Sequence, residues 1–136
     1  MKRNISLVIL TLTALALGAC KNAPQAKEIE SHQAKDLIIS LLNEKGELAQ
    51  GQNRFVIAFR SAGNNQPVDV GKVIVGSSMT MPGMAPMTAP IELESAGETG
   101  KYLAKGDFLM SGAWRFELRW DGPAGQGSTS FNSNVR

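Results

Sequence analysis

The chain has 136 residues, 43% of them hydrophobic and 19% charged, which is enough for one small domain with its own core. Lys2 and Arg3 account for the formal net charge of +2, because removing them lowers the Lys+Arg count from 14 to 12, equal to the 12 Asp+Glu residues. A mature chain without excess positive charge is not typical of nucleic-acid-binding domains, so we expect no nucleic acid partner.

Residues 1–19 predict a secretory signal peptide. Lys2 and Arg3 precede an apolar run from Ile5 to Leu17, which is too short to span a bilayer comfortably. The run ends in Leu17-Gly18-Ala19-Cys20, which resembles the lipobox of bacterial lipoproteins, where small residues precede a cysteine that is lipidated and becomes the mature N-terminus. The alternative is an ordinary signal peptide cleaved nearby, with Cys20 incidental.

Lipidation of Cys20 predicts a protein held in the cell envelope and facing the periplasm. Each buried methylene of an acyl chain contributes about 0.8 kcal/mol, so two or three chains would anchor the protein essentially permanently. The residue after the cysteine is Lys21 and not an aspartate, which resembles the sorting signal of outer-membrane rather than inner-membrane lipoproteins. Because Cys20 is the only cysteine, an acylated chain has no thiol left for a disulfide, a metal site or a nucleophile.

Residues 20–35 predict the lipidated N-terminus followed by a flexible tether. The stretch from Lys21 to Lys35 is polar and has few large apolar residues, so burial cannot offset the entropy of ordering it. His32, the only histidine, lies in this stretch. We interpret it as part of a solvated linker, with a metal-ligand role as the alternative.

Residues 36–136 predict an all-β domain. About seven runs with strand character are separated by turn signals at intervals of roughly eight to twelve residues, which favours a small antiparallel β-sandwich over a barrel. The expected strands are Asp36–Leu42, Arg54–Arg60, Pro67–Val75, Ile91–Leu93, Lys101–Ala104, Ala113–Trp120 and Ser128–Val135.

The clearest strand alternates strictly between apolar and charged residues from Ala113 to Trp120. Such alternation places one set of side chains in the core and the other in solvent. We expect the apolar set to share a buried face with that of residues 54–60, and we interpret both tryptophans as core rather than as caps on a metal. The two sets are Trp114, Phe116, Leu118 and Trp120, and Phe55, Ile57 and Phe59.

The sequence does not predict a catalytic site. The glycine-rich segment Gly122–Gly127 lacks the lysine and helix of a phosphate loop, so it predicts a hairpin turn. Glu92 and Glu94 lie on one side of an expected strand and could pair for acid/base chemistry, but a solvated face is the preferred interpretation. We therefore expect a protein that is not an enzyme.

Four of the six methionines lie in the nine residues from Met79 to Met87. Pro82 and Pro86 have no N–H to donate to a strand ladder, and Pro82-Gly83 favours a turn. This stretch therefore predicts a loop that presents its side chains.

Thioether sulfur is a soft, uncharged ligand that suits Cu(I), or Ag(I) as its mimic, and discriminates against hard cations. In a polyproline-like chain Met81 and Met87 would lie about 19 Å apart, so a turn at Pro82-Gly83 must fold the loop back before one ion can be shared. The candidate metal ligands are Met79, Met81, Met84 and Met87, with Met110 from another strand end. The alternatives are methionines that plug one end of the sandwich or form an adaptable docking surface.

Three motifs give the body a family resemblance. They are Met81-Pro82-Gly83-Met84, Gly100-Lys101-Tyr102, and Leu109 to Trp114 leading into the alternating strand. In this order, over Asp36 to Trp120, they resemble the YtkA-like periplasmic domain family, which is related to FixH-like domains. The resemblance implies an immunoglobulin-like β-sandwich with a non-enzymatic role, often beside copper transport or oxidase assembly components.

Two functional hypotheses follow from these features. The first is an envelope lipoprotein that binds Cu(I) through its methionine-rich loop, for copper handling or for oxidase or efflux support. The second is a metal-free interaction module that docks an envelope complex through the same loop.

Overall fold

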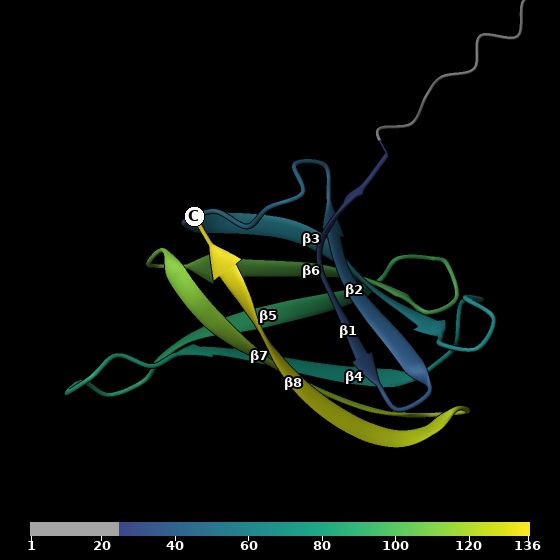
Figure 1. Ribbon diagram of the computed structural model, residues 1–136. Helices are drawn as coiled ribbons and strands as arrows, with labels where there is room; N and C mark the ends of the chain where they lie inside the picture. The colour runs from purple at the N-terminus through teal and green to yellow at the C-terminus, as the bar shows by residue number, and fades with distance from the viewer. Residues whose placement is uncertain (1–24) are drawn as a thin grey trace, which may run out of the picture.

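The structure, a computed structural model, describes residues 25–136 as an all-β domain (Figure 1). The predicted signal peptide and Cys20 lie outside these residues. Within residues 25–136 there is no helix that could cross a membrane. The strands are β1 (Lys27–Ala34), β2 (Leu37–Asn43), β3 (Gly51–Ser61), β4 (Lys72–Met79), β5 (Met87–Ser95), β6 (Lys101–Phe108), β7 (Gly112–Gly122) and β8 (Gly125–Val135).

All strand pairs are antiparallel, and the order across the sheet is β1-β2-β3-β6-β5-β4-β7-β8. The first part of β5, Met87–Pro90, pairs with β4, whereas the second part, Ile91–Ser95, pairs with β6. Figure 1 shows the two halves of the sheet curving around a common interior. The predicted antiparallel β-sandwich is therefore confirmed, with β5 belonging to both layers.

The change of partner along β5 occurs at Pro90. Pro90 is the last residue that pairs with β4, and Ile91 is the first that pairs with β6, opposite Gly106. Proline has no N–H for a ladder and is confined to edges and irregular positions, so β5 leaves β4 at a residue that cannot donate. A Cβ atom at Gly106 would lie 2.6 Å from Ile91 Cδ1, so the glycine leaves room for the Ile91 side chain.

The tether predicted for residues 20–35 is wrong over Lys27–Ala34, which form strand β1. The backbone of β1 pairs with β2, and the two strands are joined by a tight turn in which Lys35 has a φ of 53°. Ile29 and Ala34 pack against the core. This apolar face is narrow. Polar side chains of β1 add hydrogen bonds and an ion pair to residues of β2, β3 and β8, and these contacts help to hold the strand in place. The domain therefore begins before residue 36 and has eight strands.

The strand predicted for Pro67–Val75 is displaced, because β4 begins at Lys72 and continues to Met79. The Asp69 carboxylate accepts a hydrogen bond of 2.9 Å from the N–H of Gly71, which has a φ of 71°. This local turn delays the start of the strand. Val70, before the strand, is nevertheless fully buried, and Val68 is half-buried and packs against the core.

The core forms where the two predicted apolar faces meet. Trp114, Phe116 and Leu118 are fully buried, and Trp120 is 7% exposed. The rings of Phe55 and Phe116 and those of Phe59 and Trp120 meet edge to face, with centroids 6.2 and 5.8 Å apart. The prediction that these faces share one core is confirmed.

The motif Gly100-Lys101-Tyr102 has a structural role. A Cβ atom at Gly100, which has a φ of 70°, would lie 2.6 Å from the Val68 carbonyl oxygen. The Tyr102 hydroxyl donates a hydrogen bond of 2.6 Å to the Gly71 carbonyl oxygen. Burial, and secondarily the nearby Asp69 carboxylate, raises the pKa of Tyr102. The motif thus holds the segment before β4 against β6.

Truncation of Phe116 tests the assignment of the buried face. Phe116→Ala should lower the free energy of unfolding by about 3–5 kcal/mol, because it leaves a cavity among Phe55, Phe108 and Phe131. Glu117→Ala should change it by about 0.5 kcal/mol or less, because Glu117 is exposed and makes only a surface ion pair with Arg115. Chemical denaturation measures both, and equal losses would contradict the assignment.

Candidate metal site at the methionine hairpin

The loop between β4 and β5 is a hairpin whose root is a pair of methionines. Met79, the last residue of β4, and Met87, the first residue of β5, are cross-strand partners. Directly opposed residues of an antiparallel pair have Cβ atoms about 4.5–5.5 Å apart and side chains on one face. Figure 1 shows the loop projecting away from the body of the sandwich. We call residues Met79–Met87 the methionine hairpin.

A second pair of methionines lies at the tip of the hairpin. The Met84 N–H donates a hydrogen bond of 3.3 Å to the Met81 carbonyl oxygen, which closes a β-turn. Pro82 and Gly83 occupy its central positions, and the φ of 75° at Gly83 is typical of a type II turn. Such a turn brings the outer Cα atoms within about 7 Å. The predicted fold-back at Pro82-Gly83 is therefore confirmed.

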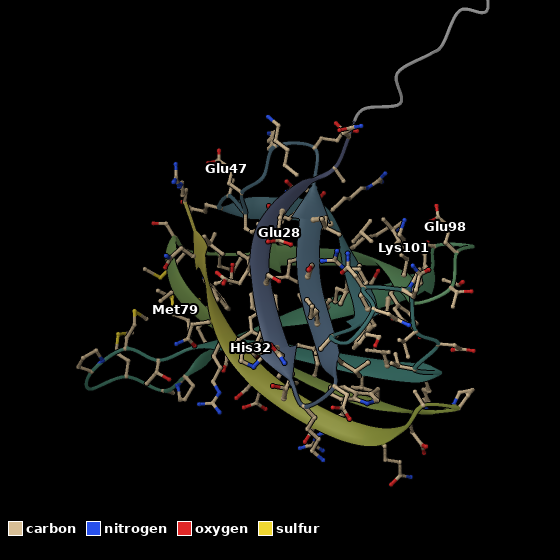
Figure 2. The ribbon with its side chains drawn as sticks, turned by 45° about the vertical axis from the view of Figure 1, so that its right-hand side comes forward. Glu28, His32, Glu47, Met79, Glu98 and Lys101 are labelled. Atoms are coloured by element: carbon tan, nitrogen blue, oxygen red, sulfur yellow. The ribbon has the colours of Figure 1, made fainter. Side chains whose placement is uncertain are left out.

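The root of the hairpin is packed against the start of β7. A Cβ atom at Gly112 would clash with the terminal methyl group of Met79, so the glycine makes room for the thioether. Met110 lies two residues before Gly112, and its carbonyl oxygen accepts a hydrogen bond of 2.9 Å from Trp114 Nε1. Figure 2 labels Met79 on the side from which the hairpin extends. The structure thus brings the β6–β7 connection that carries Met110 to the root of the hairpin.

The five candidate ligands differ in exposure. Met79 and Met87 are half-buried and pack against the core, so they do help to close one end of the sandwich. Met81 is also half-buried, whereas Met84 is 64% exposed and Met110 is 40% exposed. The hairpin therefore combines an anchored root with an accessible tip.

The donor set of the hairpin is limited to thioethers. Between Met79 and Met87 there is no charged residue, histidine or cysteine. Across residues 25–136 there is also no cluster of three or more His, Cys, Asp or Glu side chains arranged to hold a metal. Neutral sulfur ligands suit a soft monovalent ion such as Cu(I), whereas hard or divalent cations need anionic oxygen, imidazole or thiolate ligands.

His32 does not lie in a solvated linker, and that prediction is wrong. Its ring stacks on Phe131 with a centroid distance of 5.3 Å, and its Nε2 is hydrogen-bonded with Thr129 Oγ1 at 3.1 Å. These contacts connect β1 to β8 across the open side of the sandwich. His32 and Ala34 are two residues apart and therefore lie on the same side of a strand. This spacing was the only sequence signal for the position of His32.

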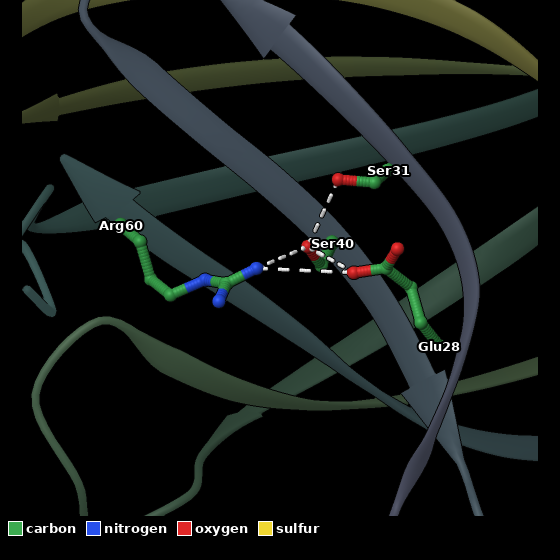
Figure 3. A network of polar contacts seen from close by, with 4 residues as sticks. All are labelled: Glu28, Ser31, Ser40 and Arg60. Atoms are coloured by element: carbon green, nitrogen blue, oxygen red, sulfur yellow. Dashed lines mark hydrogen bonds and ion pairs between the residues drawn. The ribbon is translucent and has the colours of Figure 1, made fainter. Parts of the chain in front are cut away.

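A polar network that sequence reasoning did not identify fastens β1 to its neighbours (Figure 3). The fully buried Ser40 donates a hydrogen bond of 3.1 Å to Glu28 Oε2 and accepts one of 3.1 Å from Arg60 Nη2. Ser31 approaches the same hydroxyl at 3.3 Å. The Ser40 hydroxyl is fully buried and joins residues of three strands, so the network supports the pairing of β1 with β2 and β3.

The other two candidate features are structural. Glu92 and Glu94 are both exposed, and Glu94 pairs with Lys105 Nζ at 3.0 Å, which fits a solvated face. Gly122 and Gly125 are cross-strand partners around a two-residue loop, so the predicted hairpin turn is confirmed.

Comparison with known proteins gives a family and a fold. A family model described as YtkA-like matches residues 31–119. No curated protein matches the chain. Among solved structures, a DUF4426 family protein from Pseudomonas aeruginosa aligns over 78% of this chain and 96% of its own, with 18% identity and a TM-score of 0.52. This likeness supports the fold alone.

Two structures of FetP from uropathogenic Escherichia coli are more distant. A copper-bound variant aligns over 81% of this chain and 97% of its own, with 7% identity and a TM-score of 0.44. The as-isolated protein, expressed in the periplasm, aligns over 82% and 97%, with 8% identity and a TM-score of 0.46. At these scores the likeness carries no argument about the function of this chain.

Proposed function

Since the chain belongs to the YtkA-like family, whose model spans residues 31–119, we propose that it is a non-enzymatic envelope lipoprotein that binds one Cu(I) ion at the methionine hairpin. The observation that carries the proposal is the folding of the hairpin, which gathers four thioethers into two pairs. The ligands would be drawn from Met79, Met81, Met84, Met87 and Met110.

The geometry supports convergence of these sulfurs. The turn at Pro82-Gly83 places Met81 and Met84 close together at the tip, and the strand register places Met79 beside Met87 at the root. A methionine side chain has three rotatable bonds, so small adjustments can aim the sulfurs at one ion. Met110 would approach from the β6–β7 connection.

The chemistry of the donors supports Cu(I) rather than another metal. Thioethers are neutral at every pH and have no proton to displace, so binding would hardly depend on pH, unlike binding to histidine or cysteine ligands. A site without anionic ligands would give little affinity for Zn(II), Mg(II) or Ca(II).

The proposed anchor would hold the start of the domain near a membrane. Cys20 precedes Ala26, the residue before β1, by six positions, so an extended linker would reach only about 20 Å. The hairpin would then exchange copper with envelope components, such as those of copper transport or oxidase assembly, from a lipid-anchored and periplasm-facing position.

A second function is supported by the apolar residues at the same end of the sandwich. Leu109 is 60% exposed, and Met84 and Met110 are also exposed. Methionine-rich surfaces repack readily around different partners. The alternative function is therefore a metal-free module that docks an envelope protein through this surface.

Competition for Cu(I) tests the proposed site. The chain lacking its lipid should withdraw Cu(I) from a competing chelator with similar affinity at pH 5 and pH 7, once protonation of the chelator is corrected for. Met81→Leu with Met84→Leu should abolish binding and leave the fold intact, because leucine is close to methionine in volume. Leu109→Ala is the matched control, because it removes exposed apolar surface without removing sulfur.

Two outcomes would favour the docking module instead. One is a wild-type chain that does not compete for Cu(I), and the other is undiminished binding by the double leucine variant. A docking module would tolerate the leucine substitutions and would be weakened by Leu109→Ala.

Cell fractionation tests the proposed anchor separately from the copper site. Cys20→Ser removes the acyl acceptor, so the variant should leave the membrane fraction that holds the wild-type protein. Retention of the variant in that fraction, at the wild-type level, would show that Cys20 is not the anchor.

A further inference from the structure

The two edge strands of the sandwich differ in how they are protected against pairing with another chain. Strand β1 carries Lys27, Glu28 and Glu30 and has a register irregularity between Glu28 and Glu30. Charges and bulges of this kind discourage strand addition. Strand β8, Gly125–Val135, has no charged residue and no proline, and it pairs with β7 without a bulge over its whole length.

The backbone of β8 presents free hydrogen-bonding groups on its outer edge. Gly122 and Gly125 flank a two-residue loop and therefore exchange hydrogen bonds, so the odd-numbered residues of β8 face β7 and the even-numbered residues face outward. Arg136 confirms this alternation, because its N–H donates to Leu48 and its carbonyl oxygen accepts from Gln50, at 2.8 and 2.7 Å.

The Leu48–Gln50 segment thus covers only the C-terminal end of β8. Within residues 25–136, the outward groups of Gln126, Ser128, Ser130 and Asn132 take part in no backbone hydrogen bond outside the β7–β8 ladder. Figure 1 shows β8 as the outermost strand of its layer. We call residues 126–132 the open edge.

We propose that the open edge binds the open edge of a second copy of this chain, as an antiparallel strand pair centred on Thr129. In this register Gln126 lies opposite Asn132 of the second copy, and Ser128 lies opposite its Ser130. Each pair joins hydroxyls or amides that can hydrogen-bond with each other, and the arrangement is symmetric about a two-fold axis. The four outward residues of each copy would complete their backbone ladder.

The charges around the open edge permit this pairing. Strand β8 itself has no charged residue, and the Arg115 guanidinium, which donates a hydrogen bond of 2.9 Å to Ser130 Oγ, is also paired with Glu117 at 3.3 Å. Arg115 and Arg119 lie one strand inward, on β7, opposite Asn132 and Ser128. The two β7 backbones of a dimer would be about 14 Å apart, three strand spacings, and the Arg115 charge is compensated within its own chain by Glu117. This pairing requires neither bound copper nor a lipid on Cys20.

Directly opposed residues of an antiparallel pair place their side chains on the same face. Inward-facing residues such as Thr129 and Phe131 would therefore meet inward-facing residues of the second copy. As a result, the layers that contain β1 would lie on the same side of the joined sheet.

Cysteine crosslinking in the intact envelope tests the pairing. Cys20 is the only native cysteine, so Thr129→Cys introduces one new thiol, in place of the hydroxyl that contacts His32 and at the position directly opposite its own symmetry mate. A directly opposed pair of this kind has the short Cα separation that a disulfide needs. Mild oxidation of the full-length variant should give a band of twice the chain mass, and Asn134→Cys, outside the symmetric overlap, should give none.

A charge exchange tests the register and does not depend on a cysteine. Two differently tagged copies of the wild-type chain should co-purify, and two copies carrying Ser128→Lys with Ser130→Lys should not. Mixing the lysine variant with a Ser128→Glu, Ser130→Glu variant should restore co-purification, because position 128 of each chain faces position 130 of the other.

Three outcomes would overturn the proposal. They are the absence of a Thr129→Cys dimer together with the absence of wild-type co-purification, equal crosslinking of Asn134→Cys, and failure of the opposite-charge variants to associate. A crosslinked band of another mass would identify an extended segment of a different protein as the occupant of the open edge.

Discussion

Strand β5 pairs with β4 over Met87–Pro90 and with β6 over Ile91–Ser95, so a single strand holds the two layers of the sandwich together. This constraint also sets the place of the methionine hairpin. Because the first residue of β5 is Met87, the hairpin emerges where the strand is still paired with β4. Pro90 has no N–H to donate, and it is the last residue of β5 that pairs with β4 before the strand joins β6. The functional loop therefore depends on the same strand that joins the layers.

The root and the tip of the methionine hairpin have different roles. The Met79 thioether packs beside Gly112, and both root methionines contact the core, so the base of the hairpin has a fixed direction. The turn closed by Met81 and Met84 lies outside the core, where Met84 is accessible. A soft ion would meet an oriented but adjustable set of sulfurs. The open edge belongs to β8 and not to the methionine hairpin, so copper binding and self-association would be separable.

Local patterns were sufficient to predict some features and insufficient for others. Strict alternation identified β7 and its buried face, and Pro82-Gly83 identified the turn that folds the hairpin. Strand β1 could not be predicted in this way, because its order depends on long-range contacts such as those of His32 with Phe131 and of Ser40 with Glu28 and Arg60. The contact of Met79 with Gly112 was equally hidden, because it joins residues far apart in the sequence.

The central claim is that the folded hairpin supplies only sulfur to a bound Cu(I) ion. Copper K-edge X-ray absorption of the Cu(I)-loaded chain reports the oxidation state and the elements of the first coordination shell directly. The account predicts a Cu(I) edge with a first shell of sulfur and no nitrogen or oxygen ligand, unchanged between pH 5 and pH 7. A shell that contains nitrogen or oxygen from the protein would contradict the claim, because it would place the copper away from the methionine hairpin.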